Sequence, residues 1–191
     1  MSRVSVPLRQ TSRLLNHGPT TLVASAHAGK TNVMAAAWVM PLDFNPPKLC
    51  VVVASDTHTR KLVDASGEMV VSVPSLAQLD LTFTVGTLSG ADIEDKFAKW
   101  NIATSKASVV AAPLIDGCLA WMECKVLPHP ELQKDNDLFI VEVVQAWADD
   151  EVFRDGEWLF GSAPDAKRSI HHVSKGRFFV IGDRHDAKLL E

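Results

Sequence analysis

Two short apolar runs lie close together between Thr31 and Lys61, and a turn that contains two prolines separates them. The first run, residues 32–40, is rich in small side chains, and its alanines alone would also permit a helix. The turn before it and Pro41 directly after it favour a strand. The second run, residues 49–54, is rich in valine and too short for a typical helix. Paired runs of this length predict neighbouring strands of a β-sheet.

The same pattern of short apolar runs recurs along the rest of the chain. Further strands are expected at residues 21–26, 68–74, 119–127, 138–148 and 178–181, with a tight hairpin at Asp155-Gly156. Short helices are expected at residues 60–65, 75–81 and 94–100, and Ser75 with Gln78 forms a capping-box pattern at the second. Polar residues 86–92 and 129–137 are expected to be loops. Strands joined by short polar turns predict a mainly β fold, a β-barrel with short helices.

The chain has 191 residues, of which 47% are hydrophobic, and this fits one globular domain spanning residues 1–191. Residues 1–20 are polar and contain a Gly18-Pro19 break, so we expect this N-terminal arm to be loose or to drape over a partner. No apolar run is long enough to span a bilayer. The three cysteines lack paired spacing and are expected to be reduced, buried thiols. These features predict a cytoplasmic protein without a membrane partner.

The segment from Thr31 to Lys61 also carries the clearest candidate binding site. Asn32 and Trp38 flank three small residues, Ala35 to Ala37, a combination that suits a flat ring whose polar edge needs hydrogen bonds. Residues 55–61 then offer hydroxyl groups and positive charges at the end of a strand and the start of an expected helix. A helix N-terminus attracts anions such as phosphate. A ring at one end and a phosphate at the other describe a mononucleotide.

Other chemistries find little support in the sequence. A net charge of −4 argues against nucleic acid as the main partner. The seven histidines are scattered except for His171-His172, whose side chains would point to opposite faces of a strand, so no metal site is expected. The chain lacks a Gly-x-Ser-x-Gly elbow, a phosphate loop of nucleotide triphosphatases and a Gly-x-Gly-x-x-Gly turn. A nicotinamide cofactor would therefore have to bind as a passing substrate in an open cleft.

An ordered set of motifs carries a family resemblance. These motifs are Asn32-Val33-Met34 with Trp38, Thr59 followed by Gly67-Glu68, Ser89-Gly90, Asp95-Lys96-Phe97, Glu123-Cys124 and His171-His172. In this order they resemble the flavin reductase-like proteins, including flavoredoxins, of the FMN-binding split-barrel class. The resemblance implies a split β-barrel of Greek-key type, noncovalent FMN in a groove between the subunits of a homodimer, and NAD(P)H as a transient co-substrate. It also implies that Lys96 places positive charge near the cofactor.

The chain departs from the family pattern at three positions. Asn136 stands where many relatives have a histidine, and it can donate a hydrogen bond but cannot titrate near neutral pH. Val141 replaces a frequent glycine and Thr57 a frequent arginine, which leaves His58, Arg60 and Lys61 as the nearby cations. The expected cofactor-binding residues are Asn32, Val33, Met34, Ala35, Ala36, Ala37, Trp38, Ser55, Thr57, His58, Thr59, Ser89, Gly90, Lys96 and Asn136.

Three functions remain open at this point. The first is an NAD(P)H-dependent reductase of flavin or a small acceptor, and the second is a flavoredoxin-like carrier that takes electrons from a redox partner protein. The third is a cofactor-free interaction domain in which residues 31–61 form only core and turn. The small residues Ala35, Ala36 and Ala37 would line a pocket without filling it, and this favours the reductase over the carrier. No catalytic acid can be named from the sequence.

Overall fold

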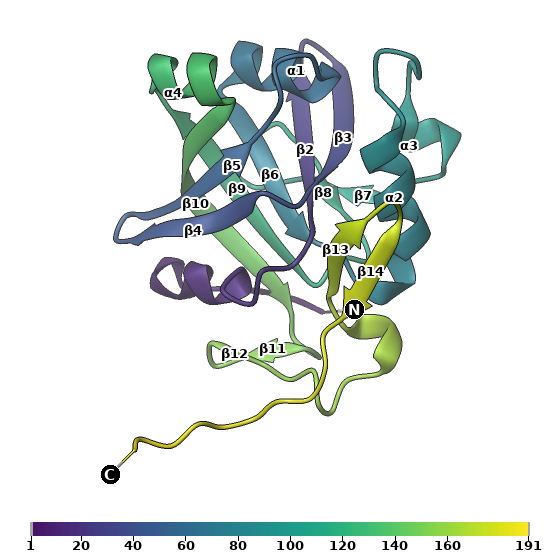
Figure 1. Ribbon diagram of the computed structural model, residues 1–191. Coiled ribbons are helices and arrows are strands. Elements are labelled where there is room, and N and C mark those ends of the chain that lie inside the picture. Colours follow the sequence, from purple (N-terminus) through teal and green to yellow (C-terminus); the bar gives the residue numbers. More distant parts are fainter. Residues whose placement is uncertain (1, 191) are drawn as a thin grey trace.

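The computed structural model describes residues 2–190, and its centre is one curved antiparallel sheet (Figure 1). The strands follow the order β3-β2-β6-β9-β10-β5-β4, and β1 pairs with β10 beside this path. The eight strands are β1 (Arg3–Ser5), β2 (Thr21–His27), β3 (Lys30–Ala36), β4 (Val39–Phe44), β5 (Pro47–Val52), β6 (Glu68–Val73), β9 (Ala120–Leu127) and β10 (Leu138–Asp149). The mainly β barrel expected from the sequence is therefore confirmed.

The β10 strand is the longest strand of the sheet, and it pairs with three others. Its first residues pair with β5, its last residues pair with β1, and β9 runs along its other side. A bulge between Val143 and Gln145 interrupts the pairing with β9, and such bulges bend a strand and increase its twist. The two edges of the curved sheet are β3 and β4, which Ala37 and Trp38 connect. The expected single strand at residues 32–40 is thus two strands with a break between them.

Smaller elements surround the barrel. The helices are α1 (His58–Ser66), α2 (Leu79–Thr87), α3 (Lys96–Lys99) and α4 (Pro130–Asn136), and the 3-10 helices are η1 (Leu8–Leu14), η2 (Leu76–Gln78) and η3 (Asp165–Lys167). Three short hairpins complete the fold: β7 (Thr104–Ser105) with β8 (Leu114–Ile115), β11 (Phe153–Arg154) with β12 (Glu157–Trp158), and β13 (Ile170–Ser174) with β14 (Arg177–Val180). The Asp155-Gly156 hairpin and the Ser75 capping box are confirmed.

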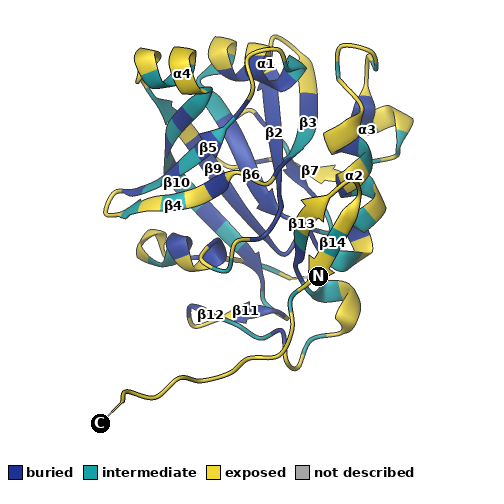
Figure 2. Ribbon diagram, in the orientation of Figure 1, coloured by how far each residue is buried: buried dark blue, intermediate teal, exposed yellow. Residues whose placement is uncertain are grey.

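Apolar side chains form one buried cluster inside the barrel and a second one against its outside. Figure 2 shows the buried stretches along the central strands β2, β6 and β9. The inner cluster includes Leu49, Met122 and Phe139. The outer cluster lies around Trp121, whose ring nitrogen donates to the Ile115 carbonyl at 2.7 Å. Its covering loop is fixed by the fully buried Glu123 carboxylate, which accepts from the backbone N–H groups of residues 108–110. Satisfying this buried charge with several donors keeps it stable in the interior.

Four local expectations are corrected by the structure. The N-terminal arm is not loose over residues 3–15, because β1 joins the sheet and Leu14 and Leu15 are buried in the barrel core. Residues 129–137 are not a simple loop but contain α4, which starts with Pro130 in its first turn. Helix α2 continues to Thr87, so the expected loop at residues 86–92 begins inside it. The last expected strand is shifted by one residue and pairs as β14.

Candidate functional site

A groove runs along the free edge strand β3, between it and helix α2. The helix packs so closely on the strand that a Cβ atom built on Gly86 would lie 2.9 Å from the Ala35 Cβ. Two neighbouring pockets along this edge form the two halves of the groove, and Gly86 and Thr87 line both of them. We call the half next to helix α1 the α1 end, lined by Asn32, His58, Thr59, Ser89, Gly90 and Lys96 among others. The half next to the β13–β14 hairpin is the hairpin end, lined by residues 35–37, Thr82, Phe83, His172 and Phe178 among others.

The α1 end is built around one buried hydrogen bond. The Asn32 side-chain amide donates to the Thr59 hydroxyl at 2.7 Å, and both residues are buried. Thr59 thus accepts from Asn32 and keeps its own hydroxyl hydrogen to donate. Gly90 approaches so closely that a Cβ atom there would overlap the Asn32 amide oxygen. The glycine is therefore required for the loop after α2 to close over Asn32.

Helix α1 presents its N-terminus to this end of the groove. Thr57 caps it, because its hydroxyl accepts from the Arg60 N–H at 3.2 Å and donates to the Ala54 carbonyl at 2.8 Å. That hydroxyl is committed to the backbone, so Thr57 shapes the helix end. The first N–H groups of a helix have no partner within the helix, and together with the helix dipole they favour an anion.

Two basic side chains border the α1 end, and burial lowers the pKa of both of them. Lys96 is 2% exposed, and its ammonium donates to the Val33 and Val85 carbonyls at 2.9 and 3.0 Å. Burial lowers the pKa of Lys96 to about 8. Burial also lowers the pKa of His58, and the nearby positive charges of Lys61, Lys30 and Lys96 add to this effect. Lys96 therefore ties β3 to α2 while it supplies a charge that depends on pH near 8.

Arg60 does not belong to this group of cations. Its guanidinium binds Asp64, Asp137 and the carbonyls of Val53 and Gln133, and it stacks over the Phe139 ring. All these partners lie away from the groove lining. The expectation that Arg60 serves as a cation of the binding site is wrong, because it links α1 to α4 and to the barrel.

The structure brings most of the expected binding residues to the groove but not all of them. Met34 and Thr57 line the α1 end, and Ala35, Ala36 and Ala37 line the hairpin end. Val33 contributes its carbonyl to Lys96. Trp38 is 75% exposed at the β3–β4 connection and lines neither half, and Ser55 and Asn136 are exposed outside the groove as well.

Several lining residues were not expected from the sequence. Thr82, Phe83 and Phe178 come from segments far from residues 31–61, and no local pattern connects them to that stretch. His172 was noted only as part of a motif. Its position is fixed by its backbone N–H, which donates to the Thr20 hydroxyl at 2.7 Å. The Thr82 hydroxyl is buried and has no hydrogen-bond partner in the described part of the chain.

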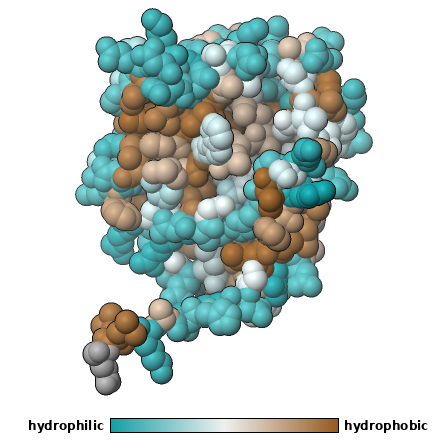
Figure 3. Space-filling view, viewed as in Figure 1, coloured by the Kyte–Doolittle hydropathy of each residue, from teal (hydrophilic) through white to brown (hydrophobic). Residues whose placement is uncertain are grey.

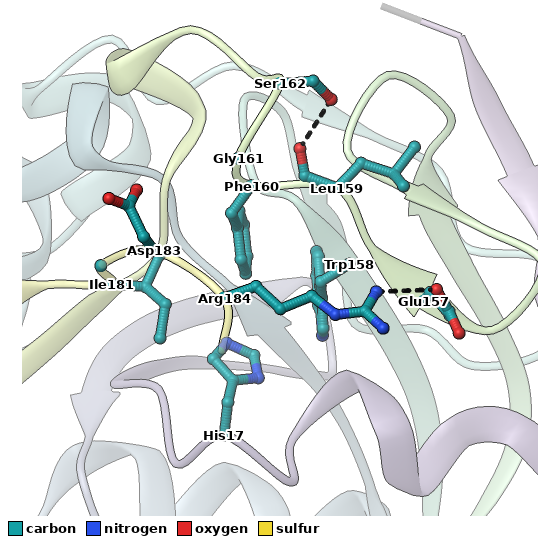
Figure 4. Close-up of a pocket in the computed structure, with 11 residues that line it drawn as sticks. His17, Glu157, Trp158, Leu159, Phe160, Gly161, Ser162, Ile181, Asp183 and Arg184 are labelled. Atoms are coloured by element: carbon teal, nitrogen blue, oxygen red, sulfur yellow. Dashed lines mark hydrogen bonds and ion pairs between the residues drawn. The ribbon is translucent and has the colours of Figure 1, made fainter. Parts of the chain in front are cut away.

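A separate pocket of about 540 Å³ lies near the C-terminal segment (Figure 4). Trp158 and Phe160 stack there with their centroids 4.7 Å apart, and His17 packs edge-on against Trp158. Burial and the neighbouring His171 lower the pKa of His17 to about 4, so its ring is neutral at physiological pH. Arg184 crosses the mouth and pairs with Glu157. Nothing in the sequence predicts this pocket.

Within residues 2–190, no group of three or more His, Cys, Asp or Glu side chains is arranged to hold a metal ion. No helix in the same range is both long and apolar enough to cross a membrane.

Known proteins resemble the chain over nearly its whole length. The model of the flavin reductase like domain matches residues 13–166. The uncharacterized protein YddH of Escherichia coli is 42% identical over 188 residues, which cover 96% of this chain and 98% of that protein. The crystal structure of an FMN-binding domain of a flavin reductases-like enzyme from Shewanella baltica has a TM-score of 0.96 and 45% identity, and the match covers 98% of each chain.

A more distant structure shares the fold. Flavoredoxin of Desulfovibrio vulgaris has a TM-score of 0.76 at 24% identity, with 89% of this chain and 90% of that chain covered. These matches confirm the split-barrel fold and the resemblance drawn from the ordered motifs. The chain belongs to the flavin reductase-like domain family.

Proposed function

We propose that this protein is an FMN-binding oxidoreductase, an NAD(P)H-dependent reductase of flavin or of a small acceptor that works as one domain in the cytoplasm. The observation that carries the proposal is the pair of adjoining pockets along β3, with a helix N-terminus at one end and small apolar walls at the other. Free thiols at Cys50, Cys118 and Cys124 fit a reducing compartment.

The groove has the length and chemistry that FMN requires. A strand rises roughly 3.3 Å per residue, so Asn32 and Ala36 are separated by about 13 Å along β3. The phosphate would lie at the α1 end, near the N–H groups of His58 and Thr59 and the charge of Lys96. The ring would lie at the hairpin end, where residues 35–37 offer flat apolar contact and the Thr82 hydroxyl lacks a partner among residues 2–190.

When bound, FMN supplies the hydride chemistry, and the chain supplies binding and orientation. The Asn32–Thr59 hydrogen bond holds the α1 end rigid, and Lys96 places positive charge beside it. The small side chains of Ala35, Ala36 and Ala37 leave room for a nicotinamide, and near-attack contact requires such an open face. An electron carrier would bind FMN in the same groove but would not need room for a nicotinamide. The open hairpin end therefore favours the reductase.

We also propose that two copies form a homodimer through the outer face of the β4 side of the sheet. Exposed apolar side chains occupy every second position from just before β4 to its end. They are Trp38, Met40, Leu42 and Phe44. Met40 lies opposite Cys50 on β5, and Cys50 lies opposite Ile140 on β10. Both of these neighbours are only half-buried. Figure 3 shows a hydrophobic area where these strands lie in Figure 1. An apolar face of this extent is typical of a protein interface.

Absorption spectroscopy and rapid kinetics test the enzymatic part of the proposal. The purified protein should carry FMN that is released on denaturation and elutes as FMN in chromatography. Anaerobic stopped flow should then show NADH or NADPH bleaching the bound flavin with saturable kinetics. A protein that neither contains nor binds FMN would contradict the proposal. A flavin that dithionite reduces readily, but that neither nucleotide reduces on a turnover timescale, would leave the electron carrier as the function.

A further inference from the structure

The hairpin end of the groove contains two polar side chains that take no part in the phosphate binding proposed at the α1 end. One is Thr82, which is fully buried and whose hydroxyl has no hydrogen-bond partner within residues 2–190. The other is His172, whose side chain is the one ionisable group among the residues that line this end in the described structure. The remaining lining residues carry hydroxyl, aromatic, methyl or glycine groups.

Thr82 differs from the other threonines of helix α2. Thr84 and Thr87 donate their hydroxyls to carbonyls one turn back, those of Asp80 and Phe83. The Thr82 hydroxyl makes no such bond, although it is the buried one of the three. An unsatisfied buried hydroxyl is costly. Ser25, Ser72 and Thr82 have such hydroxyls within residues 2–190, and of the three only Thr82 lines the groove. A polar ring edge that enters the hairpin end would supply the missing partner.

His172 is held at the mouth of the same pocket by its neighbours. Its backbone N–H donates to the buried Thr20 hydroxyl, and its ring packs edge-on against Phe178 with the ring centroids 5.1 Å apart. The residue is exposed to solvent.

No charged group shares the pocket with His172. The other residues that line the hairpin end, from β3, α2 and β14, are uncharged. On its own hairpin, His171 bonds the Gly18 carbonyl and Ser169, and Lys175 and Arg177 lie in or beside the exposed turn. The charge of the pocket in the described structure is therefore the charge of the His172 ring.

We propose that Thr82 hydrogen-bonds the polar edge of the flavin ring and that protonated His172 balances the charge that the ring gains on reduction. This inference rests on the proposed function. A ring that accepts a hydride gains two electrons and one proton, and it therefore acquires one negative charge. An imidazolium at the hairpin end stabilises that charge, since charges near the ring nitrogens tune flavin electronics. His172 thus sets how strongly the protein favours reduced over oxidised FMN, in a manner that depends on pH.

The midpoint potential of bound FMN, measured by spectroelectrochemistry from pH 6 to pH 9, tests the role of His172. His172→Phe keeps an aromatic ring against Phe178 and removes the charge, while His172→Gln keeps a hydrogen-bonding group without charge. Both should lower the affinity for reduced relative to oxidised FMN by about tenfold at pH 6, which corresponds to about 30 mV for a two-electron couple. Because histidine in general changes its charge between about pH 5 and pH 8, the difference should be smaller at pH 9. His129→Gln, at an exposed histidine that lines neither half of the groove, should match the wild type.

The Thr82→Val variant tests the second residue by a different readout. Valine has the shape of threonine without the hydroxyl, so the flavin-free protein should be as stable as the wild type or more stable. Affinity for FMN and for riboflavin should fall equally, by roughly three- to tenfold, because the contact is to the ring and not to the phosphate. Unchanged potentials in the His172 variants, or unchanged affinities in Thr82→Val, would overturn the corresponding role while FMN binding itself stands. A wild-type protein that binds no flavin would overturn the proposed function and this inference together.

Discussion

Thr59 is the residue for which the structure gives the sharpest choice between two roles. Its hydroxyl accepts from Asn32, and it is 1% exposed beside the N-terminus of α1. It could donate its hydrogen to a phosphate, or it could act only by holding Asn32 in place. The two roles differ in how they affect ligands with and without a phosphate.

We predict that Thr59→Ala weakens FMN binding by about 1.5 to 3 kcal/mol, the loss expected for a hydrogen bond to a charged group. Riboflavin, which lacks the phosphate, should lose much less. Fluorescence titration of both ligands measures the difference, and Thr59→Ser, which keeps the hydroxyl, is the matched control. Equal weakening of both ligands would show that Thr59 acts through Asn32 instead.

Lys96 gives a prediction about pH. Burial lowers its pKa from 10.5 to about 8, so between these values the unfolded chain binds more protons than the folded one. The contribution of Lys96 to the free energy of unfolding therefore rises with pH over this window. Its charge is lost over the same window, and we predict that FMN affinity falls as pH rises through about 8. Lys96→Met should remove this dependence, whereas Lys99→Met, at an exposed position of α3, should retain it. A pH-independent affinity in the wild type would contradict the prediction.

Among the elements, α1 connects the groove to the rest of the barrel through Arg60. The guanidinium pairs with Asp64 at 2.9 Å and Asp137 at 3.0 Å, and it donates to two carbonyls, with a side-chain exposure of 10%. Removing it would leave these partners unsatisfied in a largely buried place. The network therefore belongs to the stability of the fold and not to ligand binding.

We predict that Arg60→Ala lowers the free energy of unfolding by about 2 to 4 kcal/mol, because it strands a partly buried carboxylate and two carbonyls. Urea denaturation measures this loss. The ratio of FMN to riboflavin affinity should stay at its wild-type value, since the guanidinium faces away from the groove. Lys61→Ala, at the exposed neighbouring position, should change stability by no more than about 0.5 kcal/mol. A selective loss of FMN affinity in Arg60→Ala would place Arg60 back in the phosphate site.

The elements also show what sequence patterns can and cannot predict. The strands and helix α1 were predictable because their apolar spacing and turn residues are local. The α1 end was largely predictable for the same reason. Asn32 lies on β3 and residues 57–59 form the start of α1, and these two elements are close in sequence. Asp137, one of the partners of Arg60, is 77 residues away, and His172 reaches residues 35–37 only through the folded barrel. Helix α4 carried a usable signal in Pro130 at its first turn, but its polar composition resembled a loop.

At the scale of the whole molecule, the exposed stripe on β4 is the face through which we propose that two copies associate. Phe44 and Met40 are 68% and 56% exposed and lie on an edge of the sheet, where a second copy would cover them. A stable interface buries at least about 1,000 Å² in total, which requires the wider face over β4, β5 and β10 and not the stripe alone. In a two-fold interface every residue occurs twice, so one substitution introduces two changes.

We predict that the wild-type protein is a dimer in solution and that Met40→Asp or Phe44→Asp converts it to a monomer. Each variant places two carboxylates in the apolar interface, and burying an unpaired charge is strongly unfavourable. Size-exclusion chromatography with light scattering measures the mass. Leu189→Asp, which changes an apolar residue that is 97% exposed in the C-terminal segment, is the control and should remain dimeric. If FMN lies between subunits, the monomeric variants should lose it in proportion to the lost dimer. A monomer with full flavin occupancy would show that the groove of one chain is sufficient for FMN.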